Sequence, residues 1–261
     1  MPRAVRDAVA RKAGLVLSMN PVAEGRNSPL SLRLETTSGA LFVKGVPDVP
    51  GRVATQRREY AIGTHLRGLG PAARWQVRIG GWHLVAFEHL DQVRHADYRP
   101  DSVDLPKVAE LLVAVGQLPV PAGVELRRAE QRFGAYGTSE QLRHVVGGTL
   151  LHTDLNPGNV LIGDGAARLV DWGWATLGAP WLDAAAWAVW LVASGHAPES
   201  AHAWTRRVPA YRAAHPAARL AYARMSAAMW ADIAQHSSAP WAARVSTAAG
   251  EWAEHCARSW P

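Results

Sequence analysis

From Leu15 to about Leu90 the chain alternates apolar and polar side chains with a period of two, the pattern of half-buried β-strands. Turn-forming residues 37–39 separate two of these segments, and Gly80 with Gly81 separates two more, as expected for hairpins. The pattern therefore predicts a small antiparallel sheet. After a first strand that begins near Leu15, its clearest strands are Leu30–Glu35, Ala40–Val46, Trp75–Ile79 and His83–Phe87.

One helix is expected among these strands. Across Thr55–Leu69 the apolar side chains recur on one helical face, and Gly70 with Pro71 ends the segment. The sheet and this single helix define a predicted N-terminal domain, residues 1–90.

Beyond Leu90 the pattern becomes that of helices. A helix is expected after Asp104, a residue type that caps helix N-termini, with Pro106 in its first turn. Asp164 and Gly165 favour a tight turn between two strand-like segments, which predicts one hairpin. We therefore expect an α+β fold whose second domain, residues 91–261, is mainly helical. The helical segments are Leu105–Leu118, Glu130–Val146 and 181–260, and the strands are Asn159–Gly163 and Ala167–Asp171.

The composition favours a folded protein of the cytoplasm. Hydrophobic residues make up 48% of the 261 residues, enough for a substantial core. The longest apolar run, residues 184–193, is about half the length that a membrane helix needs. Cys256 is the single cysteine, so no internal disulfide can form. The basic N-terminal residues precede only a short apolar stretch without a cleavage site, which argues against a secretory leader.

The charge pattern argues against nucleic acid as a partner. The net charge of +6 comes from residues 1–100, which hold 15 basic and 8 acidic residues, whereas the remainder holds 13 and 14. The arginines are scattered and form no basic stripe or tail. The chain has only three lysines beside 25 arginines, which makes each lysine worth inspecting.

The strongest chemical signal lies in residues 151–174, where polar residues cluster on loops that flank the predicted hairpin. Asp154 at a loop tip has the chemistry to accept a proton. Asn159 and Asp171 carry hard oxygen atoms of the kind that Mg²⁺ binds beside phosphates. The hairpin is expected to bring these two side chains close together.

This segment resembles the H-G-D-x-x-P-x-N and D-x-G signatures of the aminoglycoside phosphotransferase and choline kinase family, which is related to the protein kinases. The resemblance implies a bilobal protein-kinase-like fold, with a small antiparallel sheet in the N-terminal lobe. It assigns Asp154 as the catalytic aspartate and Asn159 and Asp171 as magnesium ligands. His152 matches a structural histidine, and Asp183 matches a later aspartate that supports the catalytic loop. From the residues alone, Asp183 could also cap the apolar helix that follows it.

The resemblance also assigns nucleotide contacts in the N-terminal lobe. Lys44 on the third strand and Glu59 on the helix match an ion pair that directs the lysine toward the α- and β-phosphates of ATP or GTP. Ser28, in the loop 24–29, matches the position of a phosphate-covering loop, although G-x-G-x-x-G is absent. Backbone groups of Glu88 and Leu90 match a hinge that pairs with adenine.

Three residues depart from the family pattern without removing a catalytic group. Thr153 stands where the family prefers glycine, Asn156 replaces a common histidine, and Trp172 fills the middle of D-x-G. Asp154, Asn156 and Trp174 are the residues expected to contact the acceptor.

The resulting hypothesis is an ATP-dependent enzyme that phosphorylates a hydroxyl of a small molecule, with antibiotic inactivation as the role that the resemblance favours. A metabolic kinase for choline, homoserine or a sugar is an alternative, and a catalytically silent nucleotide-binding regulator is another. No nucleic acid or membrane partner is expected, and the oligomeric state stays open. Residues 184–261 hold seven arginines and four carboxylates, which favours a neutral, weakly charged or anionic acceptor with a flat portion that a tryptophan can stack on.

Overall fold

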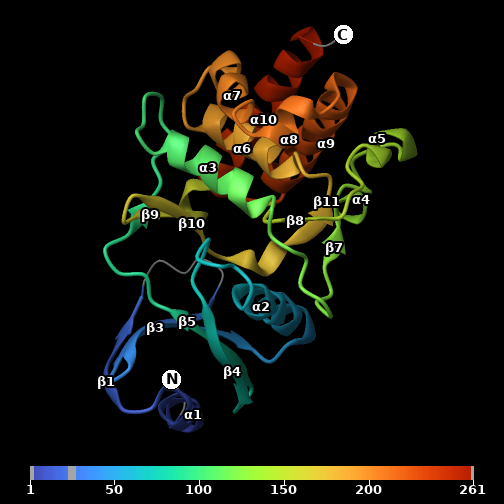
Figure 1. Ribbon diagram of the computed structural model, residues 1–261. Helices are drawn as coiled ribbons and strands as arrows, with labels where there is room; N and C mark the ends of the chain where they lie inside the picture. The colour runs from blue at the N-terminus through green and yellow to red at the C-terminus, as the bar shows by residue number, and fades with distance from the viewer. Residues whose placement is uncertain (1–2, 23–27, 260–261) are drawn as a thin grey trace. The chain divides into compact units, whose positions relative to one another are not determined.

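The computed structural model describes residues 3–22 and 28–259, and its chain divides into two compact units (Figure 1). The first unit comprises Met1–Gln92, Pro121–Glu125 and Leu169–Trp174. The second unit comprises Val93–Val120, Leu126–Arg168 and Ala175–Pro261. The first unit therefore includes the short segment that contains Asp171.

A five-stranded antiparallel sheet forms the centre of the first unit (Figure 1). The predicted hairpins are present, and in the register Lys44 lies opposite Ser31 on one side and Val85 on the other. In spatial order the strands are β1 (Val16–Pro21), β2 (Leu30–Thr36), β3 (Gly39–Pro47), β5 (Trp82–Glu88) and β4 (Ala73–Ile79).

The expectation of a single helix in the N-terminal lobe is corrected by a second one, α1 (Arg3–Ala13). Val5 and Val9, one helical turn apart, are fully buried in a core with Val43 and Leu84 of the sheet. In the sequence, the basic residues of α1 resemble the start of a leader peptide. The short apolar face of the helix is therefore hard to recognise from the sequence.

Helix α2 (Pro50–Gly63) begins and ends earlier than its sequence pattern predicts. Pro50 stands in the first turn, where its missing N–H leaves no intrahelical hydrogen bond unmade. At the other end, a Cβ on Gly63 would lie 3.0 Å from Ala73 Cβ and from a ring carbon of Phe87. The glycine thus lets the end of the helix pack closely against the sheet.

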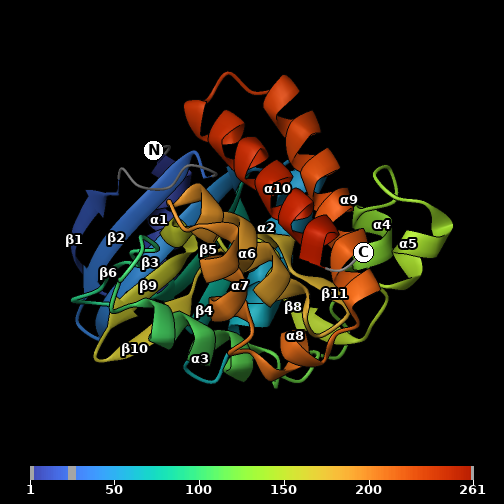
Figure 2. The ribbon, with the colours of Figure 1, turned by 90° about the horizontal axis from the view of Figure 1, so that it is seen from above.

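The second unit is mainly helical, and most of its helices begin with a proline in the first turn. The two longest helices, α9 and α10, lie side by side (Figure 2). The apolar helix α6 is largely buried. In order, the helices of this unit are α3 (Leu105–Val115), α4 (Ala129–Arg132), α5 (Ser139–Arg143), α6 (Leu182–Ala193), α7 (Pro198–Thr205), α8 (Pro209–Ala213), α9 (Pro216–Gln235) and α10 (Pro240–Ser259).

The helix predicted at Glu130–Val146 is wrong, because α4 and α5 are separate short helices. Thr138 starts α5 as its N-cap, with its hydroxyl accepting a hydrogen bond from the Gln141 N–H at 3.3 Å. Gly137 precedes it, and a Cβ there would lie only 2.3 Å from Met225 Sδ. The Thr138 N-cap starts a new helix here, and Gly137 just before it packs closely against Met225, so the two helices stay separate.

Two three-stranded sheets and two 3₁₀ helices carry the polar loops. The predicted hairpin is present as β9 and β10, with Asp164 and Gly165 at positive φ in the turn. It ends at Leu169, two residues before Asp171. The strand order in one sheet is β10 (Ala166–Leu169), β9 (Val160–Gly163), β6 (Arg94–His95). In the other sheet it is β7 (Arg127–Arg128), β11 (Thr176–Gly178), β8 (Thr149–Leu151). The 3₁₀ helices are η1 (Pro157–Asn159) and η2 (Trp172–Trp174).

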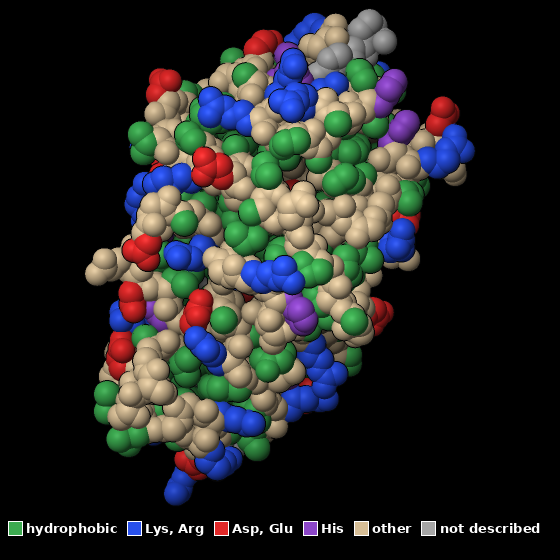
Figure 3. All heavy atoms as spheres, in the orientation of Figure 1, with side chains coloured by type: hydrophobic (Ala, Val, Ile, Leu, Met, Phe, Trp, Pro, Cys, Tyr) green, Lys and Arg blue, Asp and Glu red, His purple; other side chains and the backbone are tan. Residues whose placement is uncertain are grey.

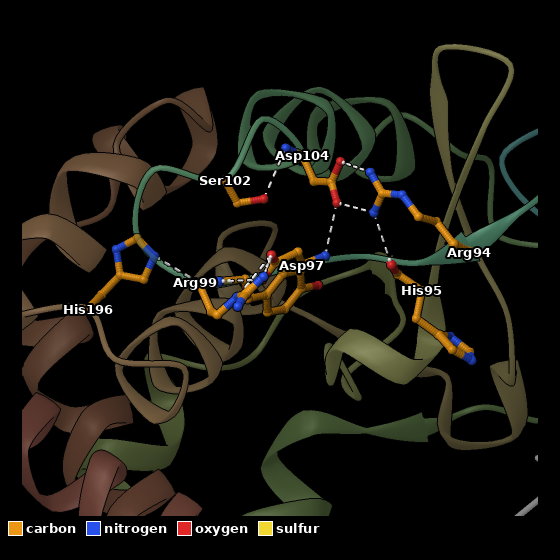
Figure 4. A network of polar contacts seen from close by, with 8 residues as sticks. Arg94, His95, Asp97, Arg99, Ser102, Asp104 and His196 are labelled. Carbon is orange, nitrogen blue, oxygen red and sulfur yellow. Dashed lines mark hydrogen bonds and ion pairs between the residues drawn. The ribbon is translucent and has the colours of Figure 1, made fainter.

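Asp104 precedes α3 but does not cap it with its side chain, which corrects the expected role. Its fully buried carboxylate accepts hydrogen bonds from Arg94 Nη1 at 2.6 Å, Arg94 Nη2 at 2.7 Å and the Asp97 N–H at 2.9 Å (Figure 4). The bonds from Arg94 hold the pKa of Asp104 below its ordinary value. Asp104 therefore ties β6 to the start of α3.

The surface carries dispersed charge. On the face drawn in Figure 3, lysine and arginine side chains are separated by acidic, apolar and neutral groups rather than gathered in one patch. Within residues 3–22 and 28–259, no helix is both long and apolar enough to cross a membrane.

Candidate active site

In the first unit, Lys44, Glu59 and Asp171 form one polar cluster although they are far apart in the sequence. Lys44 Nζ donates a hydrogen bond to Glu59 Oε1 at 2.6 Å and lies 3.5 Å from Asp171 Oδ1. The side chains of Lys44 and Glu59 are only 13% and 9% exposed. A strand, a helix and a loop thus hold one ammonium between two carboxylates.

The surroundings of Lys44 keep it positively charged. Burial lowers the pKa of Lys44, but the charges of Glu59 and Asp171 outweigh that effect and raise it above the ordinary value. For Glu59 burial is the largest influence and raises its pKa, while the Lys44 ammonium opposes that rise. The cluster therefore presents a fixed cation, which suits contact with an anion such as a phosphate.

The segment 171–173 is held tightly inside the first unit. Trp172 is buried, and its Nε1–H donates to the Leu169 carbonyl at 3.2 Å. Arg58 of α2 donates to the Gly173 carbonyl at 2.7 Å, and a Cβ on Gly173 would meet Thr55 Cγ2 at 2.6 Å. Glycine is thus required for this close approach to α2, whereas Trp172 serves as a core side chain.

In the second unit, two asparagine side chains hold the Asp154 carboxylate. Asn156 Nδ2 donates to Asp154 Oδ1 at 2.9 Å, and Asn159 Nδ2 donates to Oδ2 at 2.9 Å and to the Asp154 carbonyl at 3.0 Å. These bonds fix the carboxylate orientation. They also use the amide nitrogen of Asn159, so that its carbonyl oxygen is the atom left for a hard cation.

Asp183, in the first turn of α6, supports the loop that carries Asp154. Its carboxylate accepts the His152 N–H and the Thr153 N–H, both at 2.8 Å, and the side chain is buried in the first turn of α6. Burial raises the pKa of Asp183, opposed by these hydrogen bonds and by nearby His152 and Arg132. Because Trp181 occupies the N-cap position, the interpretation of Asp183 as a helix cap is wrong.

Histidine 152 completes the loop's anchorage. Its side chain is fully buried, and the Asp154 N–H donates to His152 Nδ1 at 3.3 Å. The residue therefore shapes the backbone on which Asp154 stands.

Arg132 of α4 is a further residue of this site, and the sequence reasoning missed it. Its Nη1 donates to Thr153 Oγ1 at 2.7 Å. Thr153 itself has φ 66°, a left-handed conformation that is costly for a β-branched residue and explains why glycine suits this position. Among 25 arginines, nothing in the local pattern distinguishes Arg132.

Replacing Asp183 with alanine is expected to destabilise the chain by about 2 to 4 kcal/mol, because two buried N–H groups would lose their acceptor. Urea unfolding near neutral pH measures this change. Glu251→Ala, at an exposed position of α10, is the matched control and should change little. A variant as stable as the native chain would show that the two hydrogen bonds contribute nothing.

The other predicted site residues are placed as follows. Glu88 ends β5, its N–H donates to the Ala72 carbonyl at 2.9 Å, and its carboxylate pairs with Arg74, so any pairing with a base has to use its carbonyl. Leu90 is half-buried just after β5, and Ser28 is half-buried just before β2, while residues 24–27 of its loop lie outside the described residues. Trp174 lies on η2 in the first unit and is 43% exposed.

The site residues therefore form two groups, one in each unit. Lys44, Glu59 and Asp171 contact one another in the first unit. Asp154 and its partners lie together in the second unit; they are His152, Asn156, Asn159 and, through the loop backbone, Asp183.

One segment of the chain matches a known protein family. Residues 138–227 match the phosphotransferase enzyme family, over the segment that contains Asp154, Asn159 and Asp171. No curated protein matches the chain significantly.

Solved structures of similar fold extend over nearly the whole chain. Choline kinase LicA from Streptococcus pneumoniae is similar with a TM-score of 0.63 and 13% identity, covering 96% of this chain and 98% of that one. A thermostable mutant of aminoglycoside phosphotransferase APH(4)-Ia gives 0.62 and 12%, covering 97% and 98%. A putative aminoglycoside phosphotransferase from Ralstonia eutropha JMP134 gives 0.65 and 11%, covering 97% of each chain.

Together the family match and the shared fold define the class. The family resemblance and the protein-kinase-like α+β fold expected from the motifs are confirmed. The match over residues 138–227 and the shared fold support a small-molecule phosphotransferase enzyme.

Proposed function

We propose that this enzyme transfers the γ-phosphoryl group of ATP, or of GTP, to a hydroxyl of a small molecule. The observation that carries the proposal is the Asp154 carboxylate, held by Asn156 and Asn159 on a loop that buried Asp183 supports. A carboxylate fixed in this way suits the orientation and deprotonation of an alcohol.

In the proposed reaction, Asp154 accepts the proton of the acceptor hydroxyl as its oxygen bonds to the γ-phosphorus. The bond from that phosphorus to the β,γ-bridging oxygen breaks, and the nucleoside diphosphate leaves with the electron pair. Asn156 and Asn159 keep the carboxylate aligned throughout. Asn156 is neutral and adds no positive charge. Other groups therefore have to stabilise the negative charge on the transferred phosphoryl group.

Lys44 is the residue proposed to bind the α- and β-phosphates, with Glu59 holding its ammonium in place. LicA has been solved with AMP, and APH(4)-Ia with AMP-PNP and hygromycin B, which supports nucleotide binding by this fold. Ser28 is proposed to contact phosphate, and backbone groups of Glu88 and Leu90 to pair with the adenine base.

Magnesium is the proposed cofactor, held by Asn159 and Asp171. The chemistry of these side chains fits the ion, because a carboxylate oxygen and an amide oxygen are ligands that Mg²⁺ accepts. When bound, the ion would neutralise charge on the β- and γ-phosphates. Within residues 3–22 and 28–259 there is no group of three or more His, Cys, Asp or Glu residues that could hold a metal ion.

Asp171→Ala is expected to weaken the magnesium-dependent part of ATP binding by about tenfold or more, because a hard oxygen ligand is lost while the nucleotide charge stays. Calorimetric titration with ATP, with magnesium and with a chelator, measures the difference. Asp91→Ala, at an exposed position of the same unit, is the control. An unchanged magnesium dependence would leave Asp171 as a turn residue.

Antibiotic inactivation in the cytoplasm is the role that we propose, in keeping with the structural similarity to APH(4)-Ia. Phosphorylation of a metabolic alcohol is the second candidate, favoured by the similarity to a choline kinase. A screen of nucleotide consumption against antibiotics, choline, homoserine and sugars tests both. Consumption with none of them, despite nucleotide binding, would instead favour a catalytically silent regulator.

A further inference from the structure

A cavity lies beside the catalytic loop, entirely within the second unit. Thr153 lines it on the loop side and Arg132 lines it from α4. Aromatic side chains make up much of the rest; they are Phe133, Trp190, Tyr222 and Trp230.

The aromatic walls of this cavity are ordered by contacts among themselves. Phe133 and Tyr222 pack edge to face with ring centres 5.3 Å apart. Trp190 and Trp230 pack in the same way at 5.7 Å. Such surfaces suit a flat apolar group, which gains both burial and ring contacts.

The charge of the cavity is set by Arg132. Its lining residues include no carboxylate among the described residues, whereas the half-buried Arg132 is one of them. Burial lowers the pKa of Arg132, and nearby Tyr222, Asp154 and Asp183 oppose that effect. An arginine stays charged at neutral pH even so.

The nearest carboxylates already have hydrogen-bond partners. Asp183 accepts two backbone N–H groups, and Asp154 accepts the amides of Asn156 and Asn159. Neither side chain lines the cavity. A polyamine would therefore meet a cation in this cavity rather than an acidic wall.

Thr153 adds an independent observation. The chain keeps a β-branched residue at φ 66° one position before Asp154, and the hydroxyl of that residue holds Arg132. Strained residues of this kind concentrate at ligand-binding and catalytic sites. The strained threonine therefore fixes Arg132 beside the residue assigned to deprotonate the acceptor.

We propose, resting on the proposed function, that this cavity receives an acceptor alcohol with a flat apolar body and an anionic group that Arg132 recognises. The cavity has a volume of about 20 Å³ as it stands, room for a single water molecule. Half-buried Trp190 and Trp230, with Met229, border it, and the proposal requires these side chains to move apart when the acceptor enters.

A matched series of aromatic alcohols tests the proposal: para-(hydroxymethyl)benzoate, benzyl alcohol and para-(hydroxymethyl)benzylamine. Binding to the full chain with magnesium and ADP near neutral pH is followed by calorimetry and by tryptophan fluorescence. The benzoate is expected to bind about tenfold or more tightly than the amine, with the uncharged alcohol between them. Equal binding of the three, including no detectable binding of any, or tighter binding of the amine would overturn the proposal.

Variants then assign the preference to one residue. Arg132→Met should abolish it and Arg132→Lys should keep part of it, while Arg143→Met, at an exposed position of α5, should leave it unchanged. If Arg132→Met does not fold, the lysine variant decides, since a preference as large as that of the native chain would contradict the role of the guanidinium.

The test separates this proposal from the proposed function. Asp154→Asn should lose turnover but keep the preference for the benzoate. Normal turnover in that variant would overturn the reaction assigned to Asp154, whereas a missing charge preference in the native chain would overturn the acceptor class alone.

Discussion

Asparagine in place of Asp154 is expected to lower turnover by about two to four orders of magnitude while the fold and nucleotide binding persist. The amide has the same shape as the carboxylate but cannot accept the acceptor proton. Asn156 and Asn159 each donate to one oxygen of the Asp154 carboxylate. In the amide one of these two oxygens is replaced by an NH₂ group, which donates and cannot accept, so one of the two hydrogen bonds is lost. Steady-state kinetics with a phosphorylated acceptor, with calorimetric ATP binding alongside, measures both properties.

Asp164→Asn is the matched control for this variant. Asp164 lies exposed in the β9–β10 turn of the same unit with φ 48°, a conformation that asparagine adopts as readily. It should retain full turnover. If Asp154→Asn also retained turnover near that of the control, another residue would have to be the base.

Methionine in place of Lys44 is expected to destabilise the chain by about 3 to 5 kcal/mol, since it leaves Glu59 buried without its cation. Catalysis should fall further than ATP affinity, because the role proposed for Lys44 is to position the phosphates and not to form the adenine site. Urea unfolding measures the free energy of unfolding, and kinetics separates kcat from KM.

The double variant Lys44→Met with Glu59→Gln should be more stable than Lys44→Met alone, because no uncompensated charge remains. Additive losses from the two single substitutions would show that the 2.6 Å contact carries no coupling.

The loss in Lys44→Met should also depend on pH. Burial raises the pKa of Glu59, and a carboxyl whose folded pKa exceeds its unfolded value is destabilising once it ionises. The variant should therefore be closest to the native chain in stability at pH values below the ordinary Glu pKa, and the gap should widen as the pH rises through the raised value. Unfolding at about pH 4, below the ordinary Glu pKa, and at about pH 8 compares the two regimes.

The sequence predicted best those features that local patterns encode. Period-two alternation located the strands of the first unit, and the Asp164–Gly165 turn located the β9–β10 hairpin. The family resemblance, carried over to Lys44 and Glu59, anticipated their contact. The roles assigned to these residues and to Asp154 stay predictions until the variants are measured.

Features that depend on tertiary contacts escaped the sequence. Asp104 looked like a helix cap, but Arg94 offers its carboxylate two hydrogen bonds that no local pattern reveals. Gly137, beside the break between α4 and α5, lies close to Met225, a neighbour that no local pattern reveals. Arg132 gains its importance only from its contact with Thr153 across the fold.

The contacts of Arg58 limit how this enzyme can be regulated. Arg58 lies on α2, one residue before Glu59. Its guanidinium donates to the carbonyls of Gly173 at 2.7 Å and Glu125 at 3.1 Å. Rotating α2 away from Lys44 would break both bonds together with the buried ion pair, at a cost of several kcal/mol. Such a rotation is therefore disfavoured unless new contacts replace these bonds. The cluster of Lys44, Glu59 and Asp171 is therefore expected to stay assembled without a ligand, and under the proposed function activity would follow the supply of nucleotide and acceptor rather than a movement of α2.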